Sequence, residues 1–273
     1  RIELVSTAGT GLVAKMQTMI AGGTPPDIGY MDPYLLVEWG RAGILENLSP
    51  YIEQETQYRD WYQTAFKLYE ADGKVYGIPQ DLQIGAIFYN KTHYAAAGLA
   101  FPEPGWTYGD LRENARRLTA KDSSGTATRY GFRIPTGRNW LLPLWAFGGD
   151  LLDDWNQPTR FTGNDPRVID GFEYLRSLVE LEAVQDEATF RATATEAAFI
   201  NQQVSMLLTN TIVLAHFGQI QDFEWDVVPL PHGPAGAVPY VNAIGWMMFS
   251  TAEHKPETWA LLRFMTTPEA LAR

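Results

Sequence analysis

The sequence of 273 residues contains no cysteine, which excludes disulfide bonds, thiolate nucleophiles and zinc–sulfur sites. Its four histidines, His93, His216, His232 and His254, are scattered, and no two of them have the spacing of a helical metal-binding pair. We therefore expect neither a metal centre nor a cofactor.

Long hydrophobic runs are also missing, since no apolar stretch approaches the roughly 18–20 residues of a membrane span. Positive charge is scarce: 21 lysines and arginines stand against 32 aspartates and glutamates, for a formal net charge of −11. Such a negative field repels phosphate backbones and anionic bilayers, so we expect no nucleic acid or membrane-surface partner. The chain opens on a strand-like RIELV instead of a basic and then apolar leader.

Aromatic residues, in contrast, are abundant, with 9 tryptophans, 13 tyrosines and 13 phenylalanines. Most of them are expected in the core, where large apolar side chains usually lie. Several stand beside glycine, proline or asparagine instead of in a periodic apolar face, and these are candidate platforms for a ligand.

The predicted elements alternate between strands and helices and show no internal repeat, which indicates an α/β fold. Residues 2–5 predict a first strand, the apolar spacing from Leu12 to Ile20 predicts a helix, and residues 27–31 predict a second strand. Together these segments predict a βαβ unit with parallel strands. Asp165 and Pro166 predict the start of a later amphipathic helix. Its expected buried face carries Val168, Phe172, Leu175 and Val179.

One motif suggests a nucleotide site. Gly9 to Ala14 matches G-x-G-x-x-A between a predicted strand and helix, and Asp32 lies near the end of the next strand. However, residues 6–8 separate the strand from Gly9, whereas the fingerprint needs its turn directly at the strand's end. We favour a small-residue loop that opens a helix and keep a dinucleotide-dependent enzyme as an alternative.

The stretch at residues 72–99, DGKVYGIPQDLQIGAIFYNKTHYAAAGL, organises the rest of the chain. Asp72-Gly73 predicts a tight hairpin turn, because both residues tolerate positive φ. Residues 74–78 and 84–89 predict two strands, and Thr92 opens an alanine-rich helix. The polar residues between the two strands are poorly placed for a core and well placed for a cleft.

The order of motifs here and downstream resembles the extracellular solute-binding proteins of family 1, the maltose-binding-protein-like receptors of bacterial ABC sugar importers. The motifs are DGKVYGIP, FYNK, GWTYGDL, Gly148-Gly149, AAFxxxxVSMLL, GWMMFS and ETWALLRFMTTPE. Each is weak alone, and their shared order over nearly the whole chain carries the resemblance. Gln202 departs from the family, which commonly has glycine there. Family members usually begin with a further strand and helix and continue after Leu271, so we expect truncation at both ends.

The resemblance implies a two-lobe periplasmic-binding-protein (type II) α/β fold with the ligand in the cleft between the lobes. Residues 1–82 and 243–273 would form the N-terminal lobe, and residues 83–242 the C-terminal lobe. The chain would cross near residues 81–83 and return near residues 240–244, and such crossings serve as hinges.

Sugar binding needs aromatic faces against the C–H side of a pyranose and planar polar groups for its hydroxyls. The expected ligand-binding residues are Trp246, Gln83, Asp81, Asn210, Trp140, Asp32, Tyr30, Asn242 and Gly245. Trp246 is the strongest candidate for stacking, and its alternative is a core tryptophan shielded by Met247 and Met248.

The other candidates also have plain alternatives. Asp81 and Gln83 could be surface loop residues, Asp32 could cap a helix, and Asn210 could make a simple turn. Of Trp140 and Trp145 we expect one in the core, and Trp140 is the better platform. In the resemblance, Gln83 stands where the maltose receptor has a carboxylate, so the sugar specificity need not carry over.

The resemblance implies a non-catalytic receptor for a sugar or oligosaccharide that works with the permease subunits of an ABC importer. We expect a periplasmic or extracellular monomer, with lipoprotein anchoring left open. The alternative is a carbohydrate-active hydrolase that uses Asp153-Asp154 or Glu180 and Glu182. Adjacent acids point apart, however, and nothing resembles an acid in an apolar pocket opposite a second carboxylate.

Overall fold

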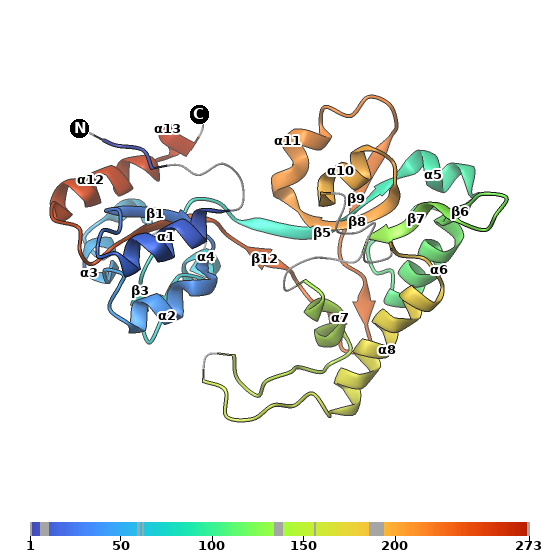
Figure 1. Cartoon of the computed structure of the whole chain (residues 1–273), viewed down its shortest axis with the longest axis horizontal. Coiled ribbons are helices and arrows are strands. Elements are labelled where there is room, and N and C mark those ends of the chain that lie inside the picture. Colours follow the sequence, from blue (N-terminus) through green and yellow to red (C-terminus); the bar gives the residue numbers. More distant parts are fainter. Residues whose placement is uncertain are drawn as a thin grey trace. The chain divides into compact units, whose positions relative to one another are not determined.

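The computed structural model describes residues 2–5, 11–58, 61, 63–133, 139–155, 157–185 and 194–271 (Figure 1). The chain divides into two compact units, which we call unit 1 (Arg1–Leu82 with Asn242–Arg273) and unit 2 (Gln83–Val241). Each unit has its own sheet and its own apolar core.

Within the described residues, unit 1 is built on a sheet with the strand order β1-β13-β4, in which both neighbouring pairs are antiparallel. The strands of unit 1 are β1 (Ile28–Met31), β2 (Glu70–Ala71), β3 (Lys74–Val75), β4 (Ile78–Pro79) and β13 (Gly245–Met248). Its helices are α1 (Leu12–Ala21), η2 (Pro33–Leu35), α2 (Leu36–Arg41), α3 (Ser49–Ile52), η3 (Thr56–Tyr58), α4 (Gln63–Lys67), α12 (Lys255–Met265) and α13 (Pro268–Leu271).

Side chains alternate between the two faces of the sheet along β13, and each face packs against its own apolar cluster. Met247 belongs to a cluster with residues of α1 and α2, including Met16 and Leu36. Met248 and Trp246 belong to a second cluster, which includes Leu262 of α12. The apolar run around β13 is therefore the centre of unit 1.

The predicted strand at residues 2–5 is wrong, and this segment is irregular. Ile2 and Leu4 are 65% and 89% exposed, and no described strand pairs with them. A strand without a hydrogen-bonded neighbour gains neither a ladder nor a buried face. The predicted parallel βαβ unit is also wrong for the described residues, because β1 pairs with β13 in the antiparallel sense. The helix predicted from Leu12 to Ile20 is confirmed as α1.

The hairpin at Asp72-Gly73 is confirmed. Both residues have positive φ, 52° and 72°, and β2 pairs with β3 through Ala71 and Lys74 on either side of the turn. The strand predicted over residues 74–78 is divided, since β3 pairs with β2 whereas β4 pairs with β13.

Unit 2 holds a mixed sheet with the order β12-β5-β8-β7-β6, and β9 also pairs with β5. The strands of unit 2 are β5 (Gln83–Asn90), β6 (Ala120–Lys121), β7 (Ala127–Arg133), β8 (Val204–Asn210), β9 (Trp225–Val228), β10 (His232–Gly233) and β11 (Gly236–Ala237), with β12 (Val241–Asn242) at the unit boundary. Of these, β10 and β11 form a separate two-stranded sheet. The helices of unit 2 are α5 (Lys91–Ala96), α6 (Tyr108–Leu118), α7 (Leu141–Ala146), α8 (Pro166–Glu180), α10 (Thr195–Ile200), η4 (Thr211–Val213) and α11 (Leu214–Phe217).

The central strand β5 is buried on both faces. Ile87 and Tyr89 pack in a cluster with residues of α6, α7 and α8, whereas Ala86 and Phe88 pack in another with residues of α10 and α11. Burial on both faces explains why this strand is a continuous apolar run instead of an alternating one.

Local signals place two helix starts of unit 2 correctly. Thr107 and Asp110 form a capping box at α6, and Asp165 caps α8. The helix predicted to open at Thr92 begins at Lys91 instead, because Asn90 is its cap. Gln202, where the family commonly has glycine, has a φ of 56°, a backbone conformation that favours glycine.

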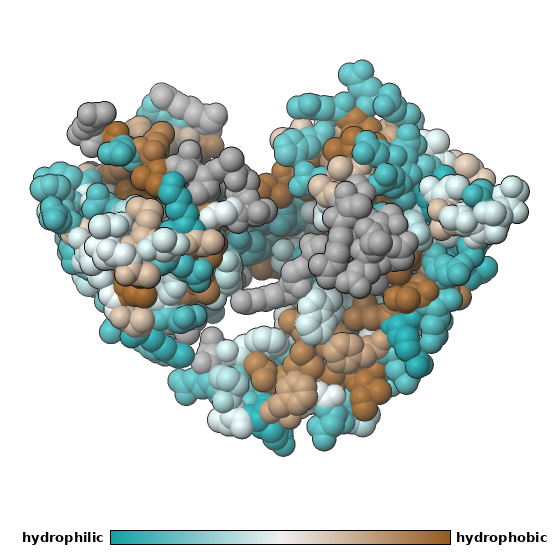
Figure 2. All heavy atoms as spheres, viewed as in Figure 1, coloured by the Kyte–Doolittle hydropathy of each residue, from teal (hydrophilic) through white to brown (hydrophobic). Residues whose placement is uncertain are grey.

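The predicted buried face of α8 is only partly right. Val168 is buried, but Phe172 and Val179 are 42% and 58% exposed. Gly171 instead faces α7, where an added Cβ would lie 2.8 Å from Leu144 Cα. This close helix contact sets which side of α8 is buried, and apolar surface remains over α7 and α8 (Figure 2).

His93 is a buried histidine on α5 in unit 2. Its Nδ1 lies 3.0 Å from Ser205 Oγ. Burial lowers the pKa of His93 from 6.5 to about 4, and the positive charge of Arg129 contributes to this decrease. A hydrogen bond with Gln202 acts in the opposite direction. The folded protein thus keeps this ring neutral under mildly acidic conditions.

We expect this burial to make stability depend on pH. Because the pKa is lower in the folded state, the stabilisation is complete above pH 6.5 and is lost as the pH falls toward 4. At pH 5 the loss amounts to about 2 kcal/mol of unfolding free energy. Urea unfolding at pH 7 and pH 5 checks this. In His93→Gln the unfolding free energy should fall by about 2 kcal/mol less between the two pH values than in the wild type. In His254→Gln, a change at an exposed site, it should fall as much as in the wild type. An equal decrease in all three proteins would contradict the assignment.

Candidate functional site

Several of the predicted site residues meet at one edge of the unit 1 sheet. The carboxyl ends of β1 and β4 and the amino end of β13 lie at this edge, because the neighbouring strands are antiparallel. This edge carries Tyr30, Asp32, Asp81, Asn242, Gly245 and Trp246, which we call the strand-end cluster.

Hydrogen bonds hold the acidic side chains of the strand-end cluster. Asn242 Nδ2 donates to Asp32 Oδ1 at 2.8 Å, and the backbone N–H of Ile244 donates to Asp81 Oδ1 at 2.8 Å. The N–H of Gln80 donates to the carbonyl oxygen of Ile244. Asp32 precedes η2 but makes no capping hydrogen bond, so its carboxylate serves the cluster instead.

Tyr30 and Trp246 form the aromatic part of the cluster. They are directly opposite each other in the β1–β13 ladder, with ring centroids 4.4 Å apart and planes inclined by 40°. Trp246 also packs against the core cluster that contains Ile78 and Met248. Its buried Nε1 finds no acceptor among the described residues. Trp246 thus has a core role, and Tyr30 shares the aromatic surface with it.

The two carboxylates influence the neighbouring phenols. Burial raises the pKa of Tyr30, and the charges of Asp81 and Asp32 raise it further. The phenol therefore stays protonated near neutral pH and can donate a hydrogen bond. Carboxylate oxygens accept hydrogen bonds and repel anions, so this surface suits hydroxyl donors better than phosphates.

Unit 2 brings a second set together, the pair of Gln83 and Asn210. Gln83 is 3% exposed, and its Oε1 accepts a hydrogen bond of 2.8 Å from Asn210 Nδ2. Asn210 Oδ1 accepts from the N–H of Ile212, so this residue also makes the turn that leaves β8. The pair lies where β5 begins and β8 ends.

Trp140 lies apart from the pair of Gln83 and Asn210. Its ring stacks on Phe172 of α8, with centroids 5.9 Å apart and planes 28° apart, and it packs against a cluster of α7 and α8 residues. Trp145 makes an edge contact with Trp155 at 6.4 Å. Both tryptophans thus contribute to the packing around α7 and α8.

The acids proposed for a hydrolase lie on the surface. Asp153 accepts hydrogen bonds from Thr159 and Arg160, first of all from the Thr159 hydroxyl, and these lower its pKa to about 2. Glu182 is paired with Lys121, and Glu180 lies 3.4 Å from Arg176. A glycosidase needs one carboxylic acid in an apolar pocket opposite a second carboxylate, and these exposed acids lack that arrangement.

The nucleotide fingerprint has little structural basis in the described residues. Gly9 and Thr10 lie outside them, and Gly11 precedes α1 without a side-chain cap. Asp32, which would bind a ribose in that interpretation, accepts from Asn242. In the part of the chain that the structure describes, no group of histidine, aspartate and glutamate side chains could hold a metal, and no helix is long and apolar enough to span a bilayer.

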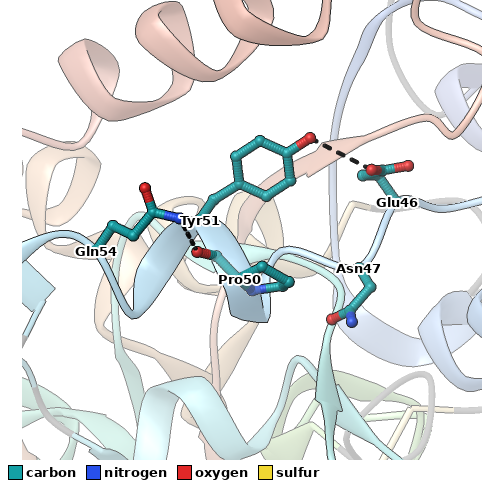
Figure 3. Close-up of a pocket in the computed structure, with 5 residues that line it drawn as sticks. All are labelled: Glu46, Asn47, Pro50, Tyr51 and Gln54. Carbon is teal, nitrogen blue, oxygen red and sulfur yellow. Dashed lines mark hydrogen bonds between the residues drawn. The ribbon is translucent and has the colours of Figure 1, made fainter.

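A separate hollow of about 430 Å³ opens on the surface of unit 1, lined by Glu46, Asn47, Pro50, Tyr51 and Gln54 (Figure 3). Tyr51 OH donates to Glu46 Oε1 at 3.4 Å, and Lys255 Nζ donates to Glu46 Oε2 at 2.8 Å. None of the predicted site residues lines it. Its polar groups are engaged largely with each other and with Lys255.

The predictions from sequence missed Tyr69, a buried residue whose hydroxyl contacts the strands of the cluster. The sequence hints at the position of Tyr69 only through two glycines, Gly77 and Gly245, whose Cα atoms lie against its ring. No spacing in the sequence connects these three residues.

Comparison with known proteins identifies the fold. A family model described as bacterial extracellular solute-binding protein matches residues 1–272. The ABC substrate-binding protein Lmo0181 from Listeria monocytogenes, solved in complex with cycloalternan, has a TM-score of 0.85 at 24% identity. The match covers 97% of this chain and 68% of that one. The predicted α/β fold of the two-lobe periplasmic binding proteins is confirmed.

Two curated relatives have similar sequences over nearly the whole chain. A binding protein of Brucella abortus is 25% identical over 262 residues, which are 93% of this chain and 61% of the relative. The multiple sugar-binding protein of Streptococcus mutans is 28% identical over 288 residues, 100% of this chain and 65% of the relative. The chain thus spans a little under two thirds of the length of these relatives.

Proposed function

The chain belongs to the bacterial extracellular solute-binding protein family, and from this premise we propose that it binds a neutral sugar or oligosaccharide for an ABC importer. It acts without chemical change of the ligand. The observation that carries the proposal is the strand-end cluster, where the Tyr30–Trp246 pair adjoins the carboxylates of Asp32 and Asp81.

The chemistry of this cluster matches that of a pyranose. An aromatic ring can cover the C–H face of a sugar, while carboxylate and amide oxygens accept hydrogen bonds from its hydroxyls. The similarity to a protein named for binding multiple sugars supports the same ligand class. The two carboxylates weigh against phosphorylated ligands, because they repel an anion.

We further propose that the side-chain amides of Gln83 and Asn210, which meet in unit 2, also hydrogen-bond a sugar ligand.

The family supports a proposal for the location and the partner. An extracellular receptor delivers its ligand to the permease subunits of an importer, and we propose this role for the chain as a monomer. The acidic charge suits a protein that must not adhere to anionic lipid or nucleic acid.

Thermal unfolding against a sugar library tests the function. Micromolar affinity corresponds to about −8 kcal/mol, and a ligand at a hundred times its Kd stabilises the folded state by about 2.7 kcal/mol. We expect at least one neutral sugar to raise the unfolding temperature and to be recovered unaltered, whereas sugar phosphates do not. Chromatography of the recovered ligand provides the second readout. Stabilisation by phosphates alone, or release of reducing ends from a glycan, would contradict the proposal.

A further inference from the structure

The hydroxyl of Tyr69 contacts the strand-end cluster at two points, Met31 at the end of β1 and Ala243 between β12 and β13. Tyr69 follows α4, far in sequence from both points, and its side chain is 0% exposed. Its hydroxyl lies 3.2 Å from the carbonyl oxygen of Met31 and 3.3 Å from that of Ala243, and it donates to this pair of acceptors. One buried O–H therefore connects the end of β1 with the residues that lead into β13.

The Tyr69 hydroxyl lies at the end of the β1–β13 ladder. The last register pair of β1 and β13 is Met31 with Gly245. Met31 therefore ends the ladder and Ala243 lies outside it, and the buried carbonyl groups of both residues need a donor. Met31 precedes Asp32 and Ala243 follows Asn242, so the hydroxyl fixes the backbone next to both members of that hydrogen-bonded pair.

Two glycines leave room for the Tyr69 ring. An added Cβ at Gly245 would lie 2.7 Å from both the Cζ and the hydroxyl oxygen of Tyr69. An added Cβ at Gly77 would overlap the ring itself. The slot that holds the phenol therefore depends on the backbone of β13 and of the segment before β4.

The environment keeps the phenol protonated. Burial raises the pKa of Tyr69 well above its usual value, and the charges of Asp32 and Asp81 act in the same direction. A neutral hydroxyl retains the hydrogen that it shares with the two carbonyl groups.

We propose that Tyr69 is a positioning residue of the sugar site, which holds Asp32 and Asn242 at their binding separation without touching the ligand. The inference rests on the proposed function. It predicts that the loss of one buried hydroxyl reduces sugar affinity, because the strand ends must then be ordered at the cost of binding.

Tyr69→Phe tests the proposal, with Tyr58→Phe as the matched control. Tyr58 is also a buried tyrosine of unit 1. It packs in the core cluster with Ile78 and Met248, and its hydroxyl lies 2.9 Å from Thr266 Oγ1 instead of bonding the carbonyl groups at the strand ends. At a temperature where all variants are folded, calorimetric titration with the best sugar should show about a five- to tenfold weaker affinity for Tyr69→Phe. Tyr58→Phe should lose stability and keep the wild-type affinity.

A second readout needs no ligand. The N–H of Ile244 donates to Asp81 Oδ1, so its hydrogen exchange reports on the order of the strand ends. In Tyr69→Phe we expect this exchange to be about tenfold faster, and in Tyr58→Phe unchanged. Wild-type affinity in Tyr69→Phe, or an equal loss in both variants, overturns the proposal. If the wild-type protein binds no sugar, the proposed function fails, and the exchange of Ile244 alone decides the role of Tyr69.

Discussion

Trp246→Ala is expected to lower the free energy of unfolding by about 3 kcal/mol and to weaken sugar binding at least tenfold. Two separate contacts give the two effects. The ring packs against the core cluster with Ile78 and Met248, so its loss leaves a cavity. It also supports Tyr30 at 4.4 Å, and without it the aromatic surface loses its fixed orientation. Denaturant unfolding with and without sugar measures both effects.

Trp259→Ala is the matched control for this prediction. Trp259, on α12, is partly buried against the same core cluster and contacts Tyr51 at 5.2 Å, but it is not part of the strand-end cluster. We expect a comparable loss of stability with wild-type affinity for the folded fraction. Wild-type affinity in Trp246→Ala, once folding is accounted for, would remove Trp246 from the site.

The second large effect is expected at Gly131 in β7. An added methyl group there would overlap the backbone carbonyl of Ala115 in α6, and backbone atoms can relieve this only by moving the helix from the sheet. Gly131→Ala should therefore cost about 3 kcal/mol or more of unfolding free energy. The contact is part of the core on which β8, and with it Asn210, is positioned.

Gly109→Ala provides the comparison for Gly131. Gly109 lies in α6 itself, and an added Cβ there meets only Thr107 Oγ1, at an ordinary 3.4 Å. Alanine favours a helix, so this variant should be within about 1 kcal/mol of the wild type or more stable. Urea unfolding of both variants checks the pair. Equal stability of the two would mean that the β7–α6 contact is looser than described.

Features with local signals could be predicted from the sequence. The Asp72-Gly73 turn, the capping box at Thr107 and the start of α8 each depend on a few adjacent residues, and each is confirmed. The general α/β character followed from the alternation of elements, and the motif order identified the family.

Features that depend on distant contacts could not be predicted. The antiparallel pairing of β1 with β13 joins opposite ends of the chain, and the predicted parallel unit failed for that reason. The buried face of α8 is set by the approach of Leu144 to Gly171, which no helical spacing reveals.

The candidate site shows the same division. Polar and aromatic residue types at strand ends were readable, and Tyr30, Asp32 and Trp246 do lie together. Whether they bind a sugar stays a prediction. Tyr69 was not readable, because its role depends on carbonyl groups of Met31 and Ala243, the latter 174 residues away.

A sugar titration followed by nuclear magnetic resonance tests the central claim, that the strand-end cluster binds a hydroxyl-rich ligand. The reporter is the indole N–H of Trp246, and the indole N–H of Trp259, outside the cluster, is the control. The account predicts that the Trp246 signal shifts as the sugar saturates the protein while the Trp259 signal stays in place. A Trp246 signal that does not move under saturating sugar would contradict it.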